Sequence, residues 1–359
     1  MEVKQSKPKK PALVASTIRP PSVEEPMQDW YQTDTHLVIV VYTRQELLQR
    51  EFVTVEIQPN GVTIQVILDK YSYFVHFKPT FPVKETSVVS VNKGKVEVKL
   101  GKVTAGQHWE YHGEGLSSNA VYTHTKSLAP KYRQWIVTKN TFVSHDTRLL
   151  RLKAPSGYTM LAPIGYHIHI VHSISGMQIG RSYTVMPPSL VEPNSDKEQE
   201  EGRALHLMIK YYSGGTLTPW VTSVSQGESI MVSNYDGNFD IQRLNNLTHL
   251  VLFAAGTGFT SMARLIIYAL NMPNATLFSV VNILSQESSN SNWKGLRGRI
   301  NSEHVQDYVP IPSSKCRPLV CICGPWAYND TVESLTKLRG LKDEHLHIFA
   351  QTFPEQTCL

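Results

Sequence analysis

The first third of the chain alternates apolar and polar residues with the period of a β-strand. Residues 53–57 and 62–66 both follow this alternation, and Pro59-Asn60-Gly61 between them is typical of a tight turn. Similar short runs recur from Trp30 to Gly113, each bounded by turn-forming residues. This spacing predicts an all-β sandwich of about seven strands.

A second series of β-type runs predicts a barrel-like antiparallel domain with many turns. The runs cover residues 133–144, 147–154, 165–174, 181–187, 204–213 and 228–234. The small, polar segment 114–128 breaks the strand rhythm before them, which predicts a boundary there. Residues 191–202 are acidic and polar and are predicted to form a surface loop.

The pattern changes again at about residue 247. Residues 250–255 form a continuous apolar run, typical of a strand buried on both faces, and a glycine turn and a helical pattern follow. The same order returns after 318–323, with helical spacing over 332–338. Strand, glycine turn and helix in succession predict a parallel-sheet α/β domain.

These patterns predict a multidomain fold with an all-β sandwich, an antiparallel β-barrel and a shortened α/β domain. The predicted divisions are a disordered linker at 1–28, the sandwich at 29–114, the barrel at 129–244 and the α/β domain at 247–359. The linker is rich in lysine and proline and has too few large apolar residues to form a core.

Composition narrows the classes of function. A net charge of +5 without a concentrated basic patch beyond the N-terminal tail argues against nucleic-acid binding. No apolar run reaches the ~18–20 residues of a membrane span, so no transmembrane segment is expected. The N-terminus lacks the apolar region of a secretory signal, and the four cysteines suit a reducing compartment. The sequence therefore predicts a soluble protein that faces the cytosol.

Neither the histidines of the sandwich nor the cysteines are spaced as metal ligands. The sandwich segment holds His36, His76, His108 and His112, none in a pair backed by cysteines. A zinc site of Cys316, Cys321 and Cys323 would lack a fourth nearby ligand. No metal site is predicted.

Two motifs carry chemistry, and each has a plain structural alternative. Gly256-Thr257-Gly258 follows a buried strand where open α/β sheets bind nucleotides, but Ser261 stands at the third glycine position of the dinucleotide fingerprint. A tight strand-to-helix turn explains it equally well. Arg181-Ser182-Tyr183-Thr184 offers a diphosphate-binding arginine, a ring-stacking tyrosine and a hydroxyl, which suit a flavin dinucleotide. In isolation it also fits an ordinary strand.

The order of the motifs resembles the ferredoxin reductase superfamily, and its cytochrome b5 reductase branch in particular. In chain order they are Pro163-Ile164-Gly165-Tyr166-His167, Arg181-x-Tyr183-Thr184, Ile209-Lys210-x-Tyr212, Gly256-Thr257-Gly258-Phe259-Thr260 and Cys323-Gly324-Pro325. The resemblance spans roughly residues 130–359. Residues 30–113, with Trp30, Lys95-Val96-Glu97-Val98 and Trp109, resemble a CS domain of the p23 type.

This resemblance implies an FAD-dependent NAD(P)H reductase and assigns roles by motif. Arg181 would bind the FAD phosphates, Tyr183 would pack on the isoalloxazine, and Thr184 would lie near flavin N5. Further FAD contacts are implied at Lys210, Tyr212, Gly215, Leu217 and Thr218, pyridine-nucleotide contacts at Gly256, Thr257, Gly258 and Thr260, and contacts beside the nicotinamide at Cys323, Gly324 and Pro325. Thr184 and Cys323 would act at the reacting centre.

The implied reaction passes a hydride from NADH or NADPH to FAD and then single electrons to a haem protein of the cytochrome b5 type or a ferric acceptor. The resemblance also implies a location on the cytosolic side of the endoplasmic reticulum and a protein partner for the CS domain.

Two departures from the family pattern change the expectation. The chain contains no His-Pro-Gly-Gly, the haem motif of its relatives, so no haem is expected in this chain. Residues 273–293 span an interval about two dozen residues shorter than in the family, and a crossover needs at least ~10–12 residues beyond its strands. A strand and its crossover helix cannot both fit, and the acidic turn that would hold the adenine ribose is absent.

Three functions follow from these observations. The first is the FAD-dependent reductase. The second is a largely inactive, shortened reductase that acts through its CS domain as an interaction protein. The third, a plain Rossmann dehydrogenase, is disfavoured because Ser261 breaks the fingerprint and the Arg181 motif would have no role.

Overall fold

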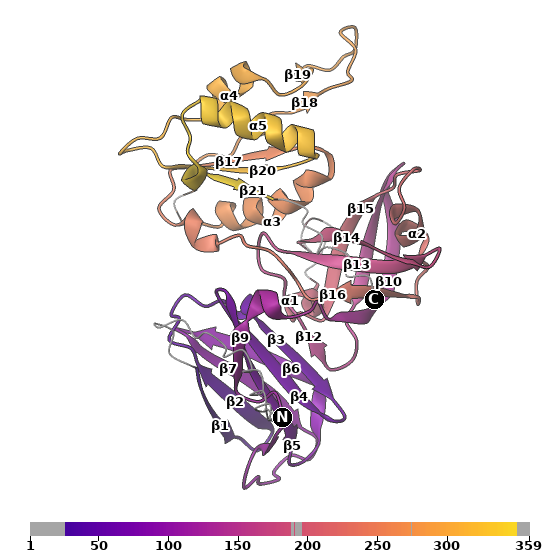
Figure 1. The fold of residues 1–359 in the computed structure, drawn as a ribbon, viewed down its shortest axis with the longest axis vertical. Coiled ribbons are helices and arrows are strands. Elements are labelled where there is room, and N and C mark those ends of the chain that lie inside the picture. The colour runs from indigo at the N-terminus through magenta and orange to yellow at the C-terminus, as the bar shows by residue number, and fades with distance from the viewer. Residues whose placement is uncertain (1–25, 188–189, 191–195, 274, 350–359) are drawn as a thin grey trace, which may run out of the picture.

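A computed structural model describes residues 26–187, 190, 196–273 and 275–349. A β-sandwich, a closed β-barrel and an α/β unit follow one another along the chain (Figure 1). The predicted fold class is therefore confirmed. Residues 1–25, most of the predicted linker, and 191–195 of the predicted acidic loop lie outside the described residues.

The sandwich packs two sheets against each other. The first has the order β1-β2-β7-β6, with β1 Met27–Gln32, β2 His36–Tyr42, β7 Lys95–Lys102 and β6 Val83–Asn92. The second has the order β12-β3-β4-β5-β8, and β9 also pairs with β5; its strands are β3 Val53–Gln58, β4 Gly61–Leu68, β5 Tyr71–Pro79, β8 Gly113–Gly115, β9 Val121–His124 and β12 Tyr158–Thr159. Alternate residues such as Val55, Ile64 and Val98 fill the core between the sheets, together with the buried Trp109.

The segment 114–128 does not simply separate two domains. Its strands β8 and β9 both add to β5, and the ring of Tyr122 stacks on Tyr71 at a centroid distance of 5.1 Å. These pairings could not be predicted from the sequence, because edge strands this short and rich in small and polar residues show little apolar periodicity.

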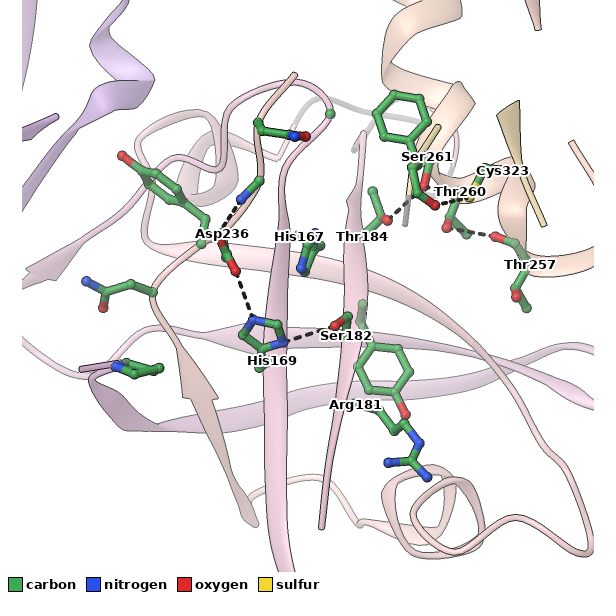
Figure 2. A pocket seen from close by; sticks show the side chains of 18 of the residues that line it. His167, His169, Arg181, Ser182, Thr184, Asp236, Thr257, Thr260, Ser261 and Cys323 are labelled. Atoms are coloured by element: carbon green, nitrogen blue, oxygen red, sulfur yellow. Dashed lines mark hydrogen bonds and ion pairs between the residues drawn. The ribbon is translucent and has the colours of Figure 1, made fainter. Parts of the chain in front are cut away.

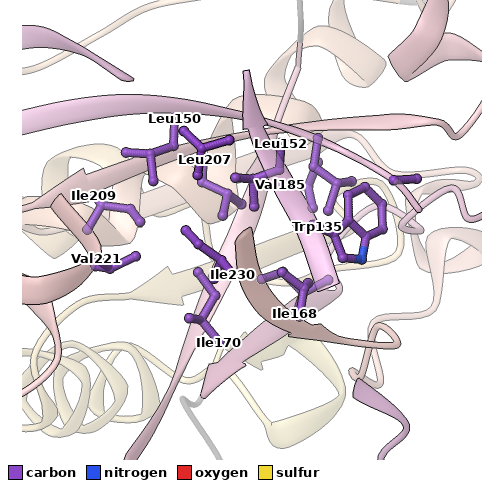
Figure 3. Packing of buried hydrophobic residues seen from close by; sticks show 14 of the residues in the cluster. Trp135, Leu150, Leu152, Ile168, Ile170, Val185, Leu207, Ile209, Val221 and Ile230 are labelled. Carbon is purple, nitrogen blue, oxygen red and sulfur yellow. The ribbon is translucent and has the colours of Figure 1, made fainter. Parts of the chain in front are cut away.

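The barrel closes in the order β10-β11-β15-β14-β13-β16. Its strands are β10 Tyr132–Ser144, β11 Thr147–Lys153, β15 Ala204–Lys210, β14 Met177–Met186, β13 His167–Ile174 and β16 Ser229–Ser233, with the helix α2 Thr218–Ser223 beside them. Figure 3 shows how Trp135, Ile168 and Leu207 point into one shared core. The period-two alternation of each strand produces this filled interior.

The described part of the acidic segment, residues 196–202, is not simply the surface loop that was predicted. Residues Lys197–Glu200 form α1, and Gln199 is buried and donates to the carbonyl of Met186 at 2.7 Å. Asp196 and Glu198 both accept hydrogen bonds from Arg151 on β11, at 2.6 Å each. The acidic residues therefore anchor this turn to the barrel.

The α/β unit has a parallel sheet in the order β17-β20-β21, with helices on both faces. Its elements are β17 His249–Ala254, α3 Phe259–Leu270, β18 Ile283–Leu284, β19 Leu296–Arg297, α4 Ser302–Tyr308, β20 Pro318–Cys323, α5 Trp326–Leu338 and β21 Leu346–Ile348. Leu319 and Cys321 face α3, whereas Val320 and Ile322 face α4 and α5. None of the described helices is both long and apolar enough to cross a membrane.

The prediction that β17 is buried on both faces was wrong. Its central residues are only half-buried, because β17 is the edge strand of a sheet with three strands in the described residues. The apolar segment 275–282 forms no strand beside it, and the side chain of Leu277 is 90% exposed. The short interval predicted from the sequence thus leaves this edge without a neighbouring strand among the described residues.

The sandwich and the barrel are joined by backbone pairing. The strand β12, which comes from the barrel part of the chain, pairs antiparallel with β3, and the N–H of Ile57 donates to the carbonyl of Gly157 at 2.8 Å. Beside this pairing Glu56 accepts hydrogen bonds from Arg133 at 2.8 and 3.0 Å and from Lys131 at 2.6 Å. Burial opposes ionisation of Glu56, but these cationic donors outweigh it and lower its pKa to about 2.

We expect Glu56→Gln to lower the free energy of unfolding by about 2 kcal/mol at pH 7, because it leaves the buried Arg133 guanidinium without a carboxylate. A lowered carboxyl pKa stabilises the fold above pH 4.5, and this contribution is lost as the pH falls towards 2. Urea unfolding at several pH values would measure both effects. Glu46→Gln, on an exposed loop of the same sandwich, is the control, and equal losses in the two variants would contradict the prediction.

Candidate functional site

A cavity of about 1180 Å³ lies where the barrel, the α/β unit and the sandwich meet. This volume is above the ~300–1,000 Å³ of most single-ligand pockets and leaves room for a dinucleotide. All of the site residues predicted from the sequence line it, although they come from distant parts of the chain. Figure 2 shows the barrel residues and the α/β residues facing each other across it.

The hairpin of β13 and β14 forms the barrel wall of the cavity. Its register pairs Thr184 with His167, Tyr183 with Ile168 and Arg181 with Ile170. Arg181 is exposed at this wall, and one of its five guanidinium N–H donors bonds the carbonyl of Gly180 at 2.7 Å. The donors beyond that bond suit a diphosphate.

Tyr183 presents an unsatisfied polar group to the cavity wall. Its hydroxyl is buried and has no hydrogen-bond partner among the described residues, and burial raises its pKa to about 12. Such a group costs free energy while it stays unbonded.

The turn after β15 forms another part of the wall. Lys210 pairs with Asp146 at 2.9 Å, and the N–H of Tyr212 donates to the hydroxyl of Thr218 at 3.2 Å. A Cβ on Gly215 would lie 2.5 Å from that hydroxyl oxygen, so a larger residue there would displace the Thr218 side chain. Leu217 is buried beneath it.

The two glycines of the Gly256-Thr257-Gly258 turn have different roles. Gly256 has a φ of +56°, and its missing Cβ points into open space at the cavity. A Cβ on Gly258 would lie 2.1 Å from the carbonyl oxygen of Cys323, so this glycine lets β17 and β20 end close together. Gly258 therefore serves the tight turn, whereas Gly256 leaves open space at the cavity, and a phosphate contact there stays a prediction.

Ser261 links the two sides of the cavity, a role that sequence analysis missed. Its hydroxyl lies 3.2 Å from the hydroxyl of Thr184 and accepts a hydrogen bond from the thiol of Cys323 at 3.4 Å (Figure 2). The fingerprint marked Ser261 only as a departure, because the contact crosses from the barrel to α3 and no local pattern carries it.

Cys323, Gly324 and Pro325 lie where β20 ends against the cavity. Burial raises the pKa of the Cys323 thiol, so it stays protonated near neutral pH, and it donates to Ser261. Cys321 is buried in the core under α3, and the Cys316 sulfur lies 3.7 Å from Nδ1 of His249.

One group of potential metal ligands occurs in the described residues, at a place where the sequence predicted no metal site. His167, His169 and Asp236 gather on the barrel wall of the cavity, with ligand atoms within 4.8 Å of one another. Two histidines at i and i+2 on one strand were the available signal, but the strand partner Asp236 is 67 residues further along than His169.

The junction of the barrel and the α/β unit contains a buried histidine with a lowered pKa. His347 packs edge-on against Phe239 and Phe349 at centroid distances of 4.8 and 4.5 Å. Burial, together with the nearby Arg243 charge, lowers its pKa to about 4.

We therefore expect the free energy of unfolding to fall by roughly 2–3 kcal/mol as the pH drops from 6.5 to 4, because the unfolded chain then binds a proton at His347 that the folded chain does not. His347→Phe should flatten this part of the profile in urea titrations. His145→Gln, at an exposed turn, should leave it unchanged. An unaltered slope in His347→Phe would contradict the assignment.

Comparison with known proteins places these features in context. Residues 26–102 match the CS domain family, and residues 134–241 match the oxidoreductase FAD-binding domain family. Cytochrome b5 reductase 4 of Danio rerio is 31% identical over 92% of this chain and 68% of its own length. The Mus musculus protein of the same name is 28% identical over 94% of this chain and 70% of its own length.

A solved structure agrees with these matches. The CS-b5R domains of human Ncb5or, in an NAD+ form, superpose with a TM-score of 0.80 at 27% identity, covering 91% of this chain and all of that one. The same order of domains is therefore present in both structures.

Proposed function

This chain belongs to the cytochrome b5 reductase 4 family of FAD-binding oxidoreductases, and on that premise we propose that it passes electrons from NADH or NADPH through FAD to a haem protein of the cytochrome b5 type or a ferric acceptor. The observation that carries the proposal is that one cavity gathers both predicted residue sets, the flavin set on the barrel and the nucleotide set on the α/β unit. A hydride transfer needs the two cofactors in contact, which a shared cavity allows.

The residues present fit an FAD. Arg181 offers donors for a diphosphate, and the Gly215 turn offers close backbone approach. Tyr183 lines the cavity and would supply an aromatic surface for the planar flavin ring. Lys210, Tyr212, Leu217 and Thr218 would complete the FAD contacts. FAD held by these residues would supply the chemistry that links a two-electron nicotinamide donor to one-electron acceptors.

The nucleotide side has its own set of contacts. Gly256, Thr257 and Thr260 would hold the pyridine nucleotide at the start of α3, and Gly258 would shape the turn. Cys323, Gly324 and Pro325 would lie beside the nicotinamide. The Cys323 thiol, kept neutral by burial, and Ser261 would position the Thr184 hydroxyl for the reacting centre.

The test is anaerobic reduction of the FAD-loaded chain. Purified protein should take up FAD and show flavin absorbance, NADH or NADPH should bleach it, and ferricyanide or ferric cytochrome b5 should restore it. A chain that binds no FAD, or bound FAD that neither nucleotide reduces, would contradict the proposal.

The open edge of β17 favours a second candidate function. No strand neighbours this edge in the part of the chain that the structure describes, and the acidic turn is missing from the sequence. The adenosine half of the nucleotide would therefore have fewer contacts, and the CS domain would act mainly as an interaction module. This candidate predicts normal FAD binding with slow nucleotide oxidation. Rapid NADH oxidation with ferricyanide would rule it out.

We also propose the divisions 1–28, 29–114, 129–244 and 247–359 as linker, CS, FAD-binding and NAD(P)H-binding parts. The family matches at 26–102 and 134–241 support the middle two. A location at the cytosolic face of the endoplasmic reticulum, the absence of haem from this chain and a protein partner for the CS domain rest on the resemblance. Fractionation of cells would test the location, and a pull-down would test the partner. A haem assay of the purified chain would test the absence of haem.

A further inference from the structure

The cluster of His167, His169 and Asp236 is built on a rigid part of the barrel. The two histidines stand two residues apart on β13, so their side chains leave the same face of the strand. Asp236 follows β16 and pairs with His167 through two backbone hydrogen bonds, at 2.9 and 2.8 Å. The backbone alone therefore brings the carboxylate to the histidines.

Neighbouring residues form hydrogen bonds that orient the side chains of His169 and Asp236. Nδ1 of His169 lies 3.0 Å from the hydroxyl of Ser182, and Oδ1 of Asp236 accepts the N–H of Gly237 at 2.8 Å. These contacts leave Nε2 of His169 facing Oδ2 of Asp236 (Figure 2). A hydrogen bond on the second ring nitrogen is the usual support of a metal-binding histidine, because it fixes the ring and its tautomer.

The distance between the facing atoms suits a bridging cation. Nε2 and Oδ2 are 3.6 Å apart, which is longer than the ~3.2 Å limit of a good N–H···O hydrogen bond. Two ligands of a tetrahedral zinc ion, each bonded at about 2.0–2.2 Å, lie roughly 3.4 Å apart. This separation therefore accommodates both the His169–Asp236 ion pair and two ligands of one cation.

His167 supplies an independent observation. Its Nε2 atom is buried and has no hydrogen-bond partner among the described residues, although the ring lies 5.0 Å from that of His169. A His169–Asp236 ion pair would leave this nitrogen unsatisfied, whereas a cation held by all three groups would satisfy it.

We propose that His167, His169 and Asp236 bind a divalent transition-metal ion of the Zn²⁺ class, with a fourth coordination position open to the cavity. Two neutral imidazoles and one carboxylate match the borderline-soft preference of zinc, and three protein ligands with one open position are typical of sites that also bind water or a ligand. All three residues line the cavity, so the open position is accessible from it. The ion would add local positive charge beside the strand pair of His167 and Thr184.

Calorimetric titration of the full chain, loaded with FAD and stripped with chelator, with Zn²⁺ would test the proposal. We expect one site per chain, weakened at least tenfold in both His169→Gln and Asp236→Asn. His172→Gln is the matched control, because His172 lies on the same strand but stacks on Trp220 at 3.7 Å, and it should bind like the unaltered chain. No binding, or equal binding in all variants, would overturn the proposal.

X-ray absorption at the zinc edge of the unaltered chain gives a readout that does not depend on how the variants fold. Two imidazole nitrogens with oxygen neighbours are expected. Sulfur in the coordination shell would overturn the proposal and place the ion near Cys316 and His249. Cys316→Ser should leave binding at the proposed site unchanged.

Discussion

Replacing Arg181 by leucine is expected to raise the dissociation constant of the protein for FAD about 100-fold, because two charge-assisted hydrogen bonds to a diphosphate are together worth roughly 3 kcal/mol. The chain should still fold, because the Arg181 side chain is exposed at the cavity wall. Its guanidinium donates a hydrogen bond to the carbonyl of the adjacent residue, Gly180. Equilibrium titration of the flavin-free protein, followed by quenching of FAD fluorescence, would measure the change.

Arg148→Leu is the matched control for this substitution. Arg148 is also a barrel arginine, but it stacks over Phe142 at 3.4 Å and does not line the cavity. Its loss should leave FAD affinity unchanged. Equal weakening by both substitutions would mean that Arg181 acts through the general charge of the barrel rather than through direct contact.

The change Gly258→Ala should destabilise the α/β unit by about 3 kcal/mol. The added Cβ would lie 2.1 Å from the carbonyl oxygen and 2.5 Å from the carbonyl carbon of Cys323, so the ends of β17 and β20 would have to move apart. Overpacking against backbone has few routes of relief. Chemical unfolding monitored by far-UV circular dichroism, with the unaltered chain as reference, would detect the loss.

Gly256→Ala separates stability from binding at the same turn. Nothing lies within 4 Å of its added Cβ, so stability should fall only by the ~1–2 kcal/mol cost of a left-handed conformation. The affinity for the nucleotide should fall by more than the loss of stability alone would explain, because the methyl group enters the cavity. If Gly256→Ala were the more destabilising of the two substitutions, the proposed division of roles would be wrong.

Most of the fold could be predicted from the strand periodicity. Most of the residues that line the cavity as candidates could be predicted from the order of the motifs. Alternation over residues 53–66 predicted β3 and β4, and the runs between 133 and 234 predicted the six barrel strands. The short interval at 273–293 correctly suggested an incomplete sheet beside β17. These features are local, so a single sequence contains them.

Features that depend on distant pairings were not predictable in this way. The hydroxyl bridge from Thr184 through Ser261 joins residues 77 positions apart, and β12 pairs with β3 across about 100 residues. The half-buried state of β17 arises because no strand pairs with its outer edge among the described residues, and the apolar run itself does not indicate this. His169 and Asp236 meet because β13 and β16 adjoin in the closed barrel.

The pairing of β12 with β3 would restrict how the haem-protein acceptor proposed above reaches the cavity. The β12–β3 pairing and the Glu56–Arg133 contact both join the sandwich to the barrel. The sandwich therefore cannot rotate relative to the barrel without breaking both. It instead forms a fixed side of the opening, where Thr54, Gln65 and Phe74 stand among the lining residues. A docking protein therefore has to fit a surface that these β-strands have already shaped.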